Sequence, residues 1–111
     1  MSAQLPIAIF DSGIGGLTVF QAISHLLPSE NIVYLADNKR VPYGNLSAET
    51  IVRYVRESIC FLEQRQVKLI VLACHTASTR CLLDGSFCEG FQIPILGMVQ
   101  GSLQVFRQKP F

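Results

Sequence analysis

Residues 7–16, with the sequence IAIFDSGIGG, decide the fold class of this chain. Their first four residues form a continuous apolar run that stops at Asp11, as is typical of a strand covered on both faces. The glycine-rich remainder leads directly into residues 17–27, which predict an amphipathic helix that ends near Pro28. The apolar arc of that helix consists of Val19, Phe20, Ala22, Ile23, Leu26 and Leu27.

The rest of the chain continues this alternation of strand and helix. Further buried strands are predicted at residues 31–36, 67–73 and 93–97. A helix is expected after Ser47, which can cap it, with Glu49 in its first turn and a buried stripe of Ile51, Val55, Ile59 and Leu62. Residues 74–83 predict a loop that enters another helix. This order favours an α/β fold, a doubly wound open parallel sheet in three α/β/α layers.

Composition narrows the class of protein. The 111 residues are 50% apolar and 15% charged, with a net charge of +1, which indicates one ordinary globular domain. The basic residues are scattered, so neither nucleic acid nor an anionic membrane surface is an expected partner. No apolar run approaches the ~20 residues that cross a bilayer, and the start of the chain shows no targeting segment. We therefore expect a cytoplasmic protein whose four cysteines are reduced thiols.

Polar residues follow three of the predicted strands. In an open parallel sheet, ligands bind beyond the carboxyl ends of the strands. Asp11 and Ser12 follow the first strand, and Asp37 follows the second, with Tyr43 and Gly44 a little later. Cys74, His75 and Thr76 follow the third. These three groups are expected to converge on one edge of the sheet.

The glycine-rich segment has several interpretations. Its backbone N–H groups and the following helix N-terminus could hold a carboxylate or a phosphate. It lacks the Lys-Ser/Thr ending of a P-loop, and Thr18 stands where a dinucleotide fingerprint has its third glycine or alanine. Asp37, however, could bind a ribose. A glycine turn that only satisfies tight geometry is the structural alternative.

Cys74 is the candidate nucleophile or base. The positive end of the helix that follows it favours a thiolate, although a cysteine after an apolar strand is often a core residue. Asp11 could exchange a proton with this thiol, or could instead cap its own turn. His75 is adjacent in the chain, so an intimate Cys-His pair is not expected. The spacing of Cys74, Cys81 and Cys88 does not resemble a zinc site, and no metal is predicted.

Three segments together resemble the glutamate racemase family. They are residues 9–19 (IFDSGIGGLTV), 41–44 (VPYG) and 73–78 (ACHTAS), in matching order and spacing. The resemblance implies interconversion of L- and D-glutamate without a cofactor such as pyridoxal phosphate, which supplies D-glutamate for peptidoglycan. By the same match Cys74 is one catalytic thiol and Asp11 assists it. The residues implied in substrate binding are Ser12, Tyr43, Gly44, His75 and Thr76.

The chain departs from the family pattern in two ways. His75 occupies a position where the family has asparagine, and an imidazole can imitate an amide only in one tautomer. Family members are also roughly twice as long, and the second catalytic cysteine is absent here. We therefore interpret residues 1–97 as the N-terminal domain of a two-domain racemase, and residues 98–111 as the start of the second domain or a truncated tail. A homodimer that opposes two Cys74 thiols is a further hypothesis. A dinucleotide-binding module and a non-catalytic remnant remain the alternative functions.

Overall fold

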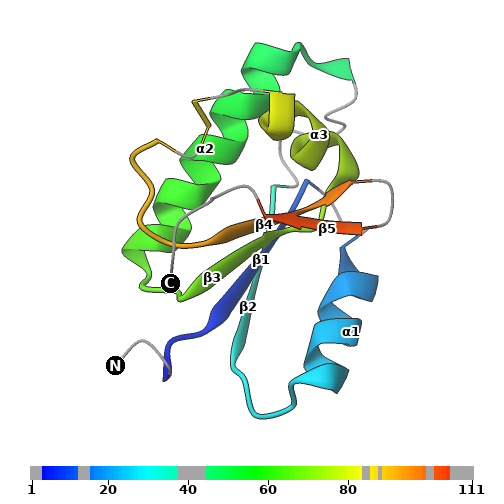
Figure 1. The fold of residues 1–111 in the computed structure, drawn as a ribbon, viewed down its shortest axis with the longest axis vertical. Coiled ribbons are helices and arrows are strands. Elements are labelled where there is room, and N and C mark those ends of the chain that lie inside the picture. The colour runs from blue at the N-terminus through cyan, green and yellow to red at the C-terminus, as the bar shows by residue number, and fades with distance from the viewer. Residues whose placement is uncertain are drawn as a thin grey trace.

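A computed structural model describes residues 4–12, 16–37, 45–83, 86–87, 89–99 and 102–105. Strands and helices alternate along most of the chain (Figure 1). The elements are β1 (Ile7–Asp11), α1 (Leu17–Leu26), β2 (Ile32–Ala36), α2 (Ala48–Gln64), β3 (Leu69–Leu72), α3 (His75–Leu83), β4 (Ile95–Val99) and β5 (Ser102–Val105).

The strands form one sheet in the order β2-β1-β3-β4-β5. The first four are parallel to one another, and β1 is paired with both β2 and β3. The predicted α/β fold with a doubly wound parallel sheet is confirmed. The fifth strand was not predicted; it pairs antiparallel with β4, and Leu103 lies opposite Met98.

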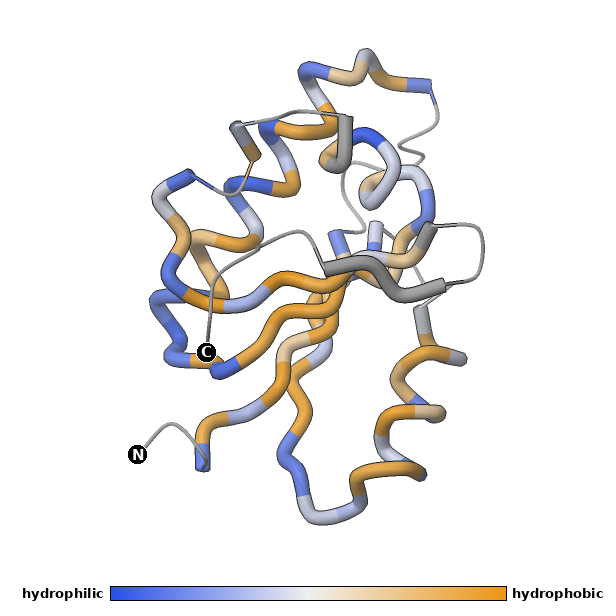
Figure 2. The backbone as a smooth tube through the Cα atoms, in the orientation of Figure 1, coloured by the Kyte–Doolittle hydropathy of each residue, from blue (hydrophilic) through white to orange (hydrophobic). Residues whose placement is uncertain are grey.

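Helices cover both faces of the sheet and make the three layers that the sequence predicts. In Figure 1, α1 lies on one side of the strands and α2 and α3 on the other. Alternate residues of β1 explain this arrangement, because successive side chains of a strand point to opposite faces. Ala8 and Phe10 belong to the large core under α2 and α3, whereas Ile7 and Ile9 belong to a smaller cluster that contacts α1. Figure 2 shows the resulting band of hydrophobic residues along the central strands.

Helix α2 forms as the sequence predicts. The Ser47 side chain accepts a hydrogen bond from the Thr50 backbone N–H at 3.2 Å, and Glu49 lies in the first turn. The apolar stripe is completely buried against the sheet, and it consists of Ile51, Val55, Ile59 and Leu62. The described helices include none that is long and apolar enough to cross a membrane.

Helix α1 forms as the sequence predicts, over Leu17–Leu26, but its apolar arc is only partly covered. Val19, Phe20 and Ile23 contact the smaller cluster, but no residue of α1 is buried. Leu26 is 76% exposed, and Ala22 and Leu27 are exposed as well. The arc is wider than the strip of sheet below it, so its outer positions face away from the core.

The predicted strand at residues 93–97 lies two residues further along, as Ile95–Val99. The carbonyl of Pro94 still accepts a hydrogen bond from Ile70 N–H at 3.1 Å. The domain boundary after Gly97 remains a prediction. It would separate β5 from the sheet to which β5 is hydrogen-bonded in this chain.

Candidate active site

The carboxyl ends of β1 and β3 lie side by side and carry the two residues at the centre of the site. Phe10 is in register with Leu72, and Ala73 N–H donates to the Phe10 carbonyl at 2.7 Å. Continuing this register by two residues brings Ser12 next to Cys74. The Ser12 hydroxyl oxygen is 3.1 Å from the Cys74 sulfur, with either atom able to donate. The ends of these two strands thus lie together, as the sequence predicts.

Cys74 occupies the N-cap position of α3. Its carbonyl accepts the first helical hydrogen bond, from Ser78 N–H at 2.9 Å. Its sulfur lies 3.5 Å from the backbone nitrogen of Ala77, which donates to it. A cap side chain normally offers oxygen to this third amide of the helix. This hydrogen bond holds the Cys74 sulfur at the start of α3.

Asp11 reaches the same edge of the sheet but faces the α1 side. Its Oδ2 accepts hydrogen bonds from Gly16 N–H at 2.6 Å and from the Tyr34 hydroxyl at 3.1 Å, and the residue is only 4% exposed. Residues 11 and 12 alternate in direction, so Ser12 rather than Asp11 faces Cys74. Among the described residues, the carboxylate and the thiol share no hydrogen bond. The contact with Gly16 is the turn-capping role that the sequence left open, and assistance to Cys74 stays a prediction.

Tyr34 is a site residue that sequence reasoning missed. It comes from β2, directly beside β1, where Ile9 is its partner in register. Burial, the negative charge of Asp11 and the hydrogen bond to Asp11 together raise the pKa of Tyr34 to about 12. The hydroxyl therefore stays protonated and acts as a donor. A tyrosine inside an apolar strand was the available signal, because a buried hydroxyl usually finds a partner.

Ser78 is a second residue that the sequence did not single out. It is completely buried, and its hydroxyl donates to the Leu72 carbonyl at 3.0 Å. The same oxygen accepts from Met98 N–H at 3.0 Å. One side chain thus connects α3 to the ends of β3 and β4, one helical turn after Cys74.

The remaining predicted residues divide into two groups. His75 and Thr76 form the start of α3, where His75 is exposed and Thr76 is half-buried. Both therefore lie beside Cys74 at the sheet edge. Tyr43 and Gly44 lie outside the described residues, as does the middle of the glycine segment, residues 13–15.

The other cysteines have different surroundings. Cys60 is exposed on α2, and Cys81 is buried in the main core. Cys88 lies outside the described residues. Within the part of the chain that the structure describes, no three His, Cys, Asp or Glu side chains gather in a way that could hold a metal ion.

Comparisons with known proteins agree with this geometry. A glutamate racemase of Chlorobaculum tepidum is 45% identical over 109 residues, which are 98% of this chain and 40% of that protein. A glutamate racemase of Picosynechococcus is 47% identical over 96 residues, which are 86% of this chain and 34% of the relative. The crystal structure of the Thermus thermophilus glutamate racemase in complex with beta-chloro-D-alanine superposes with a TM-score of 0.80 at 41% identity, over 87% of this chain and 37% of that one. This chain belongs with the N-terminal part of the glutamate racemases.

The match to glutamate racemases is partial in length. The chain spans between 34% and 40% of the two relatives named above. The glutamate racemase of Aquifex pyrophilus gives the same picture, with a TM-score of 0.78 at 45% identity over 84% of this chain and 36% of that one. No family model matches the chain.

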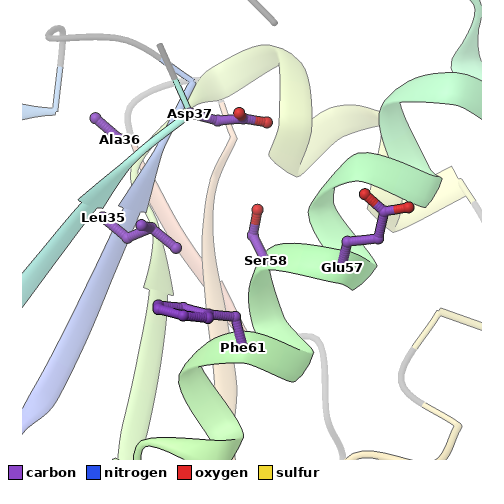
Figure 3. Close-up of a pocket in the computed structure, with 6 residues that line it drawn as sticks. All are labelled: Leu35, Ala36, Asp37, Glu57, Ser58 and Phe61. Carbon is purple, nitrogen blue, oxygen red and sulfur yellow. The ribbon is translucent and has the colours of Figure 1, made fainter. Parts of the chain in front are cut away.

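Kinship with glutamate racemases disfavours the dinucleotide alternative, and the surroundings of Asp37 agree. Asp37 lines a cavity of about 270 Å³ between β2 and α2 (Figure 3), together with Leu35, Ala36, Glu57, Ser58 and Phe61. In that view Asp37 and Glu57 bring two carboxylates to the cavity. A second acidic group does not suit a ribose bound next to phosphates. Neither Cys74 nor Asp11 lines this cavity.

Proposed function

We propose that this chain forms one half of a glutamate racemase active site, in which Cys74 exchanges the proton on the central carbon of glutamate. The observation that carries the proposal is the environment of the Cys74 sulfur. It lies at the carboxyl edge of a parallel sheet, where ligands bind in such folds. The Ser12 hydroxyl and the Ala77 amide are within hydrogen-bond distance of it and hold it in place.

The chemistry is a reversible proton transfer. The thiolate takes the proton from Cα, and the electron pair of the broken C–H bond moves into the adjacent carboxylate to give an enolate. The thiol then returns a proton to the same carbon, and between the two steps it can exchange with solvent. Such a step needs a base positioned within about 3 Å of the hydrogen it removes, and neither a redox partner nor a cofactor such as pyridoxal phosphate enters the balance.

Substrate binding is proposed at the same sheet edge. The start of α3 presents Thr76 and His75 beside the thiol, and free amides at a helix start suit a carboxylate. Ser12 is close enough to Cys74 to contact a substrate held there. Tyr43 and Gly44 complete the proposed set. His75, in the place of an amide side chain, would hold the substrate through one ring nitrogen as donor or acceptor.

Asp11 is proposed to support the site as a buried negative charge at the end of β1. Its carboxylate would favour the protonated form of groups nearby and so help a proton to return to the thiol or the substrate. The described hydrogen bonds of Asp11 hold it toward α1, so this support acts across the end of the strand and through the turn that presents Ser12.

Inversion of the stereocentre requires a second acid-base group on the opposite face of Cα. The chain matches about a third to two-fifths of its relatives, and we propose that the second group comes from a segment equivalent to their remaining length. A homodimer that opposes two Cys74 thiols is the alternative source. The proposed role is supply of D-glutamate for peptidoglycan in the cytoplasm.

Structures of related enzymes support the choice of substrate. One is an Escherichia coli glutamate racemase in complex with L-glutamate and the activator UDP-MurNAc-ala, which is 40% identical to this chain over 85% of its length. Another is a Francisella tularensis glutamate racemase in complex with D-glutamate, at 37% identity over 85% of this chain. L-glutamate and D-glutamate are the two amino acids that the sheet edge is proposed to bind.

Solvent exchange in D2O tests the proposal. The purified chain is incubated with L-glutamate, and proton NMR follows loss of the Cα signal, while chiral chromatography follows D-glutamate. We expect exchange that Cys74→Ser abolishes. A folded wild-type chain that binds glutamate but never exchanges its Cα proton would refute the proposal. Thermal stabilisation by NAD but not by glutamate would support the dinucleotide alternative instead.

A further inference from the structure

Two donors, one from β2 and one from the start of α1, meet on one oxygen of Asp11. Tyr34 from β2 donates to Oδ2 at 3.1 Å, and the backbone N–H of Gly16, the N-cap residue of α1, donates to the same oxygen at 2.6 Å. The carboxylate is buried at the end of β1. Hydrogen bonds to a charged group are stronger than those between neutral groups, so this arrangement fixes the Asp11 side chain firmly.

The same three residues are also packed too closely to shift independently. A Cβ atom on Gly16 would lie 3.0 Å from the Tyr34 hydroxyl and 3.1 Å from the Asp11 Cβ. The Tyr34 ring also makes an edge-on contact with Phe20 of α1, at 6.1 Å between ring centroids. This packing contact is separate from the hydrogen bond between the Tyr34 hydroxyl and Asp11.

Fixing Asp11 also fixes Ser12. The two residues are adjacent in the chain, and the Gly16 hydrogen bond holds the Asp11 side chain at this end of β1. Ser12 is the residue whose hydroxyl lies 3.1 Å from the Cys74 sulfur. Loss of the hydrogen bond between Asp11 and Gly16 would remove a restraint on the end of β1, directly before that hydroxyl.

We infer that Tyr34 is a positioning residue of the active site: its hydroxyl locks the Asp11 side chain at the end of β1, so that Ser12 stays beside Cys74. This inference rests on the proposed function for its catalytic consequence. Tyr34 acts through Asp11 and Ser12, so its loss is expected to slow the chemical step and to leave glutamate binding nearly intact. The raised pKa of Tyr34 agrees with a hydroxyl that serves only as a donor.

The test uses Tyr34→Phe, which deletes only the hydroxyl, and Phe20→Leu as the matched control. Tyr34→Phe keeps the contact between the two rings and removes the donor to Asp11, whereas Phe20→Leu disturbs the ring contact and keeps the donor. For Tyr34→Phe we expect kcat of glutamate Cα exchange to fall roughly tenfold, the effect of losing a hydrogen bond to a charged group, with KM unchanged. Phe20→Leu should lower the melting temperature without changing kcat.

A second measurement tests the positioning of Asp11 by Tyr34 independently of the reaction. The amide proton of Gly16, observed by NMR in the 111-residue chain, reports its bond to Asp11 without any substrate. Tyr34→Phe is expected to shift this resonance and speed its exchange with solvent, while Phe20→Leu leaves it in place. If the wild-type chain exchanges no glutamate but the Gly16 amide responds in this way, the proposed function is wrong, whereas the positioning of Asp11 by Tyr34 is supported. An unchanged Gly16 amide together with an unchanged kcat in Tyr34→Phe would overturn the inference.

Discussion

The Ser12 hydroxyl oxygen lies 3.1 Å from the sulfur of Cys74, although the two residues are 62 positions apart in the chain. The contact exists because β1 and β3 are parallel neighbours in matching register. It places a hydroxyl next to a thiol that is half-buried at the sheet edge, so it should influence how fast that thiol reacts.

Ser12→Ala tests that influence. Loss of the hydroxyl leaves the Cys74 sulfur with the Ala77 amide, so alkylation of Cys74 by iodoacetamide should slow roughly three- to tenfold at constant pH. Mass spectrometry of the Cys74 peptide measures the rate separately from the exposed Cys60. Ser29→Ala, in the turn before β2, is the control and should behave as wild type. Equal rates in both variants would mean that the hydroxyl does not influence the thiol.

Two substitutions of Cys74 separate its cap from its chemistry. Serine is among the best N-cap residues, so Cys74→Ser should retain the stability of wild type, whereas Cys74→Ala should lose about 1 kcal/mol of unfolding free energy. Both variants should lose Cα exchange completely. Urea denaturation and deuterium incorporation into glutamate measure the two effects. Residual exchange in Cys74→Ser would point to another base.

Gly16→Ala should destabilise the chain by crowding. The new Cβ would lie 2.9 Å from the Cβ of Ala73, closer than such atoms approach in folded proteins. Overpacking of this kind costs about 1–3 kcal/mol. Adding Ala73→Gly removes the nearest obstacle, so the double variant should be less destabilised than the sum of the two single variants. Strict additivity in a double-mutant cycle would show that the two Cβ positions do not collide.

The raised pKa of Tyr34 should make the stability of the chain depend on pH above pH 10. Its pKa is raised from the ordinary value of 10.0 to about 12. A pKa that is raised by folding contributes stability that is complete below pH 10 and is lost as the pH rises through about 12. Between these limits the unfolding free energy of wild type should fall more steeply than that of Tyr34→Phe. Urea denaturation at a series of pH values checks this, and parallel curves would contradict it.

Ser78→Ala should be costly, because it removes a hydroxyl that satisfies two backbone groups inside the core. The Leu72 carbonyl and the Met98 amide would both lose a partner, at about 1–3 kcal/mol for a buried unsatisfied group. Ser58→Ala is the matched control, since its hydroxyl only bonds back to the Tyr54 carbonyl within α2. The control should change stability by less than about 0.5 kcal/mol. Similar losses of unfolding free energy in both variants would show that the two Ser78 hydrogen bonds contribute no more than the one of Ser58.

The fold was predictable wherever local pattern and burial agree. Continuous apolar runs identified β1, β2 and β3, and Ser47 with its apolar stripe identified α2. The strand β5 escaped prediction because residues 102–105 (SLQV) have no continuous apolar run and pair only through their contact with β4. The exposed half of α1 escaped because periodicity gives the width of an apolar face but not the area of sheet available to cover it.

The site was predictable to the level of strand ends, but not to that of side-chain direction. Parallel order placed Asp11, Ser12 and Cys74 at one edge, as expected. Successive side chains point to opposite faces at the end of β1, so only one of Asp11 and Ser12 can face the thiol. In the structure Ser12 faces Cys74, and Asp11 faces Tyr34. Tyr34 and Ser78 were missed because their partners are backbone or carboxylate groups distant in sequence.

The sparse burial of α1 divides the molecule into regions of unequal protection. Helix α2 is anchored by five buried side chains, whereas α1 has none. Amides of α1 should therefore open to solvent well before the rest of the chain unfolds. Since Gly16 is the N-cap residue of α1, the Asp11 carboxylate links a helix without buried side chains to a completely buried strand, and the proposed catalytic edge lies at this junction.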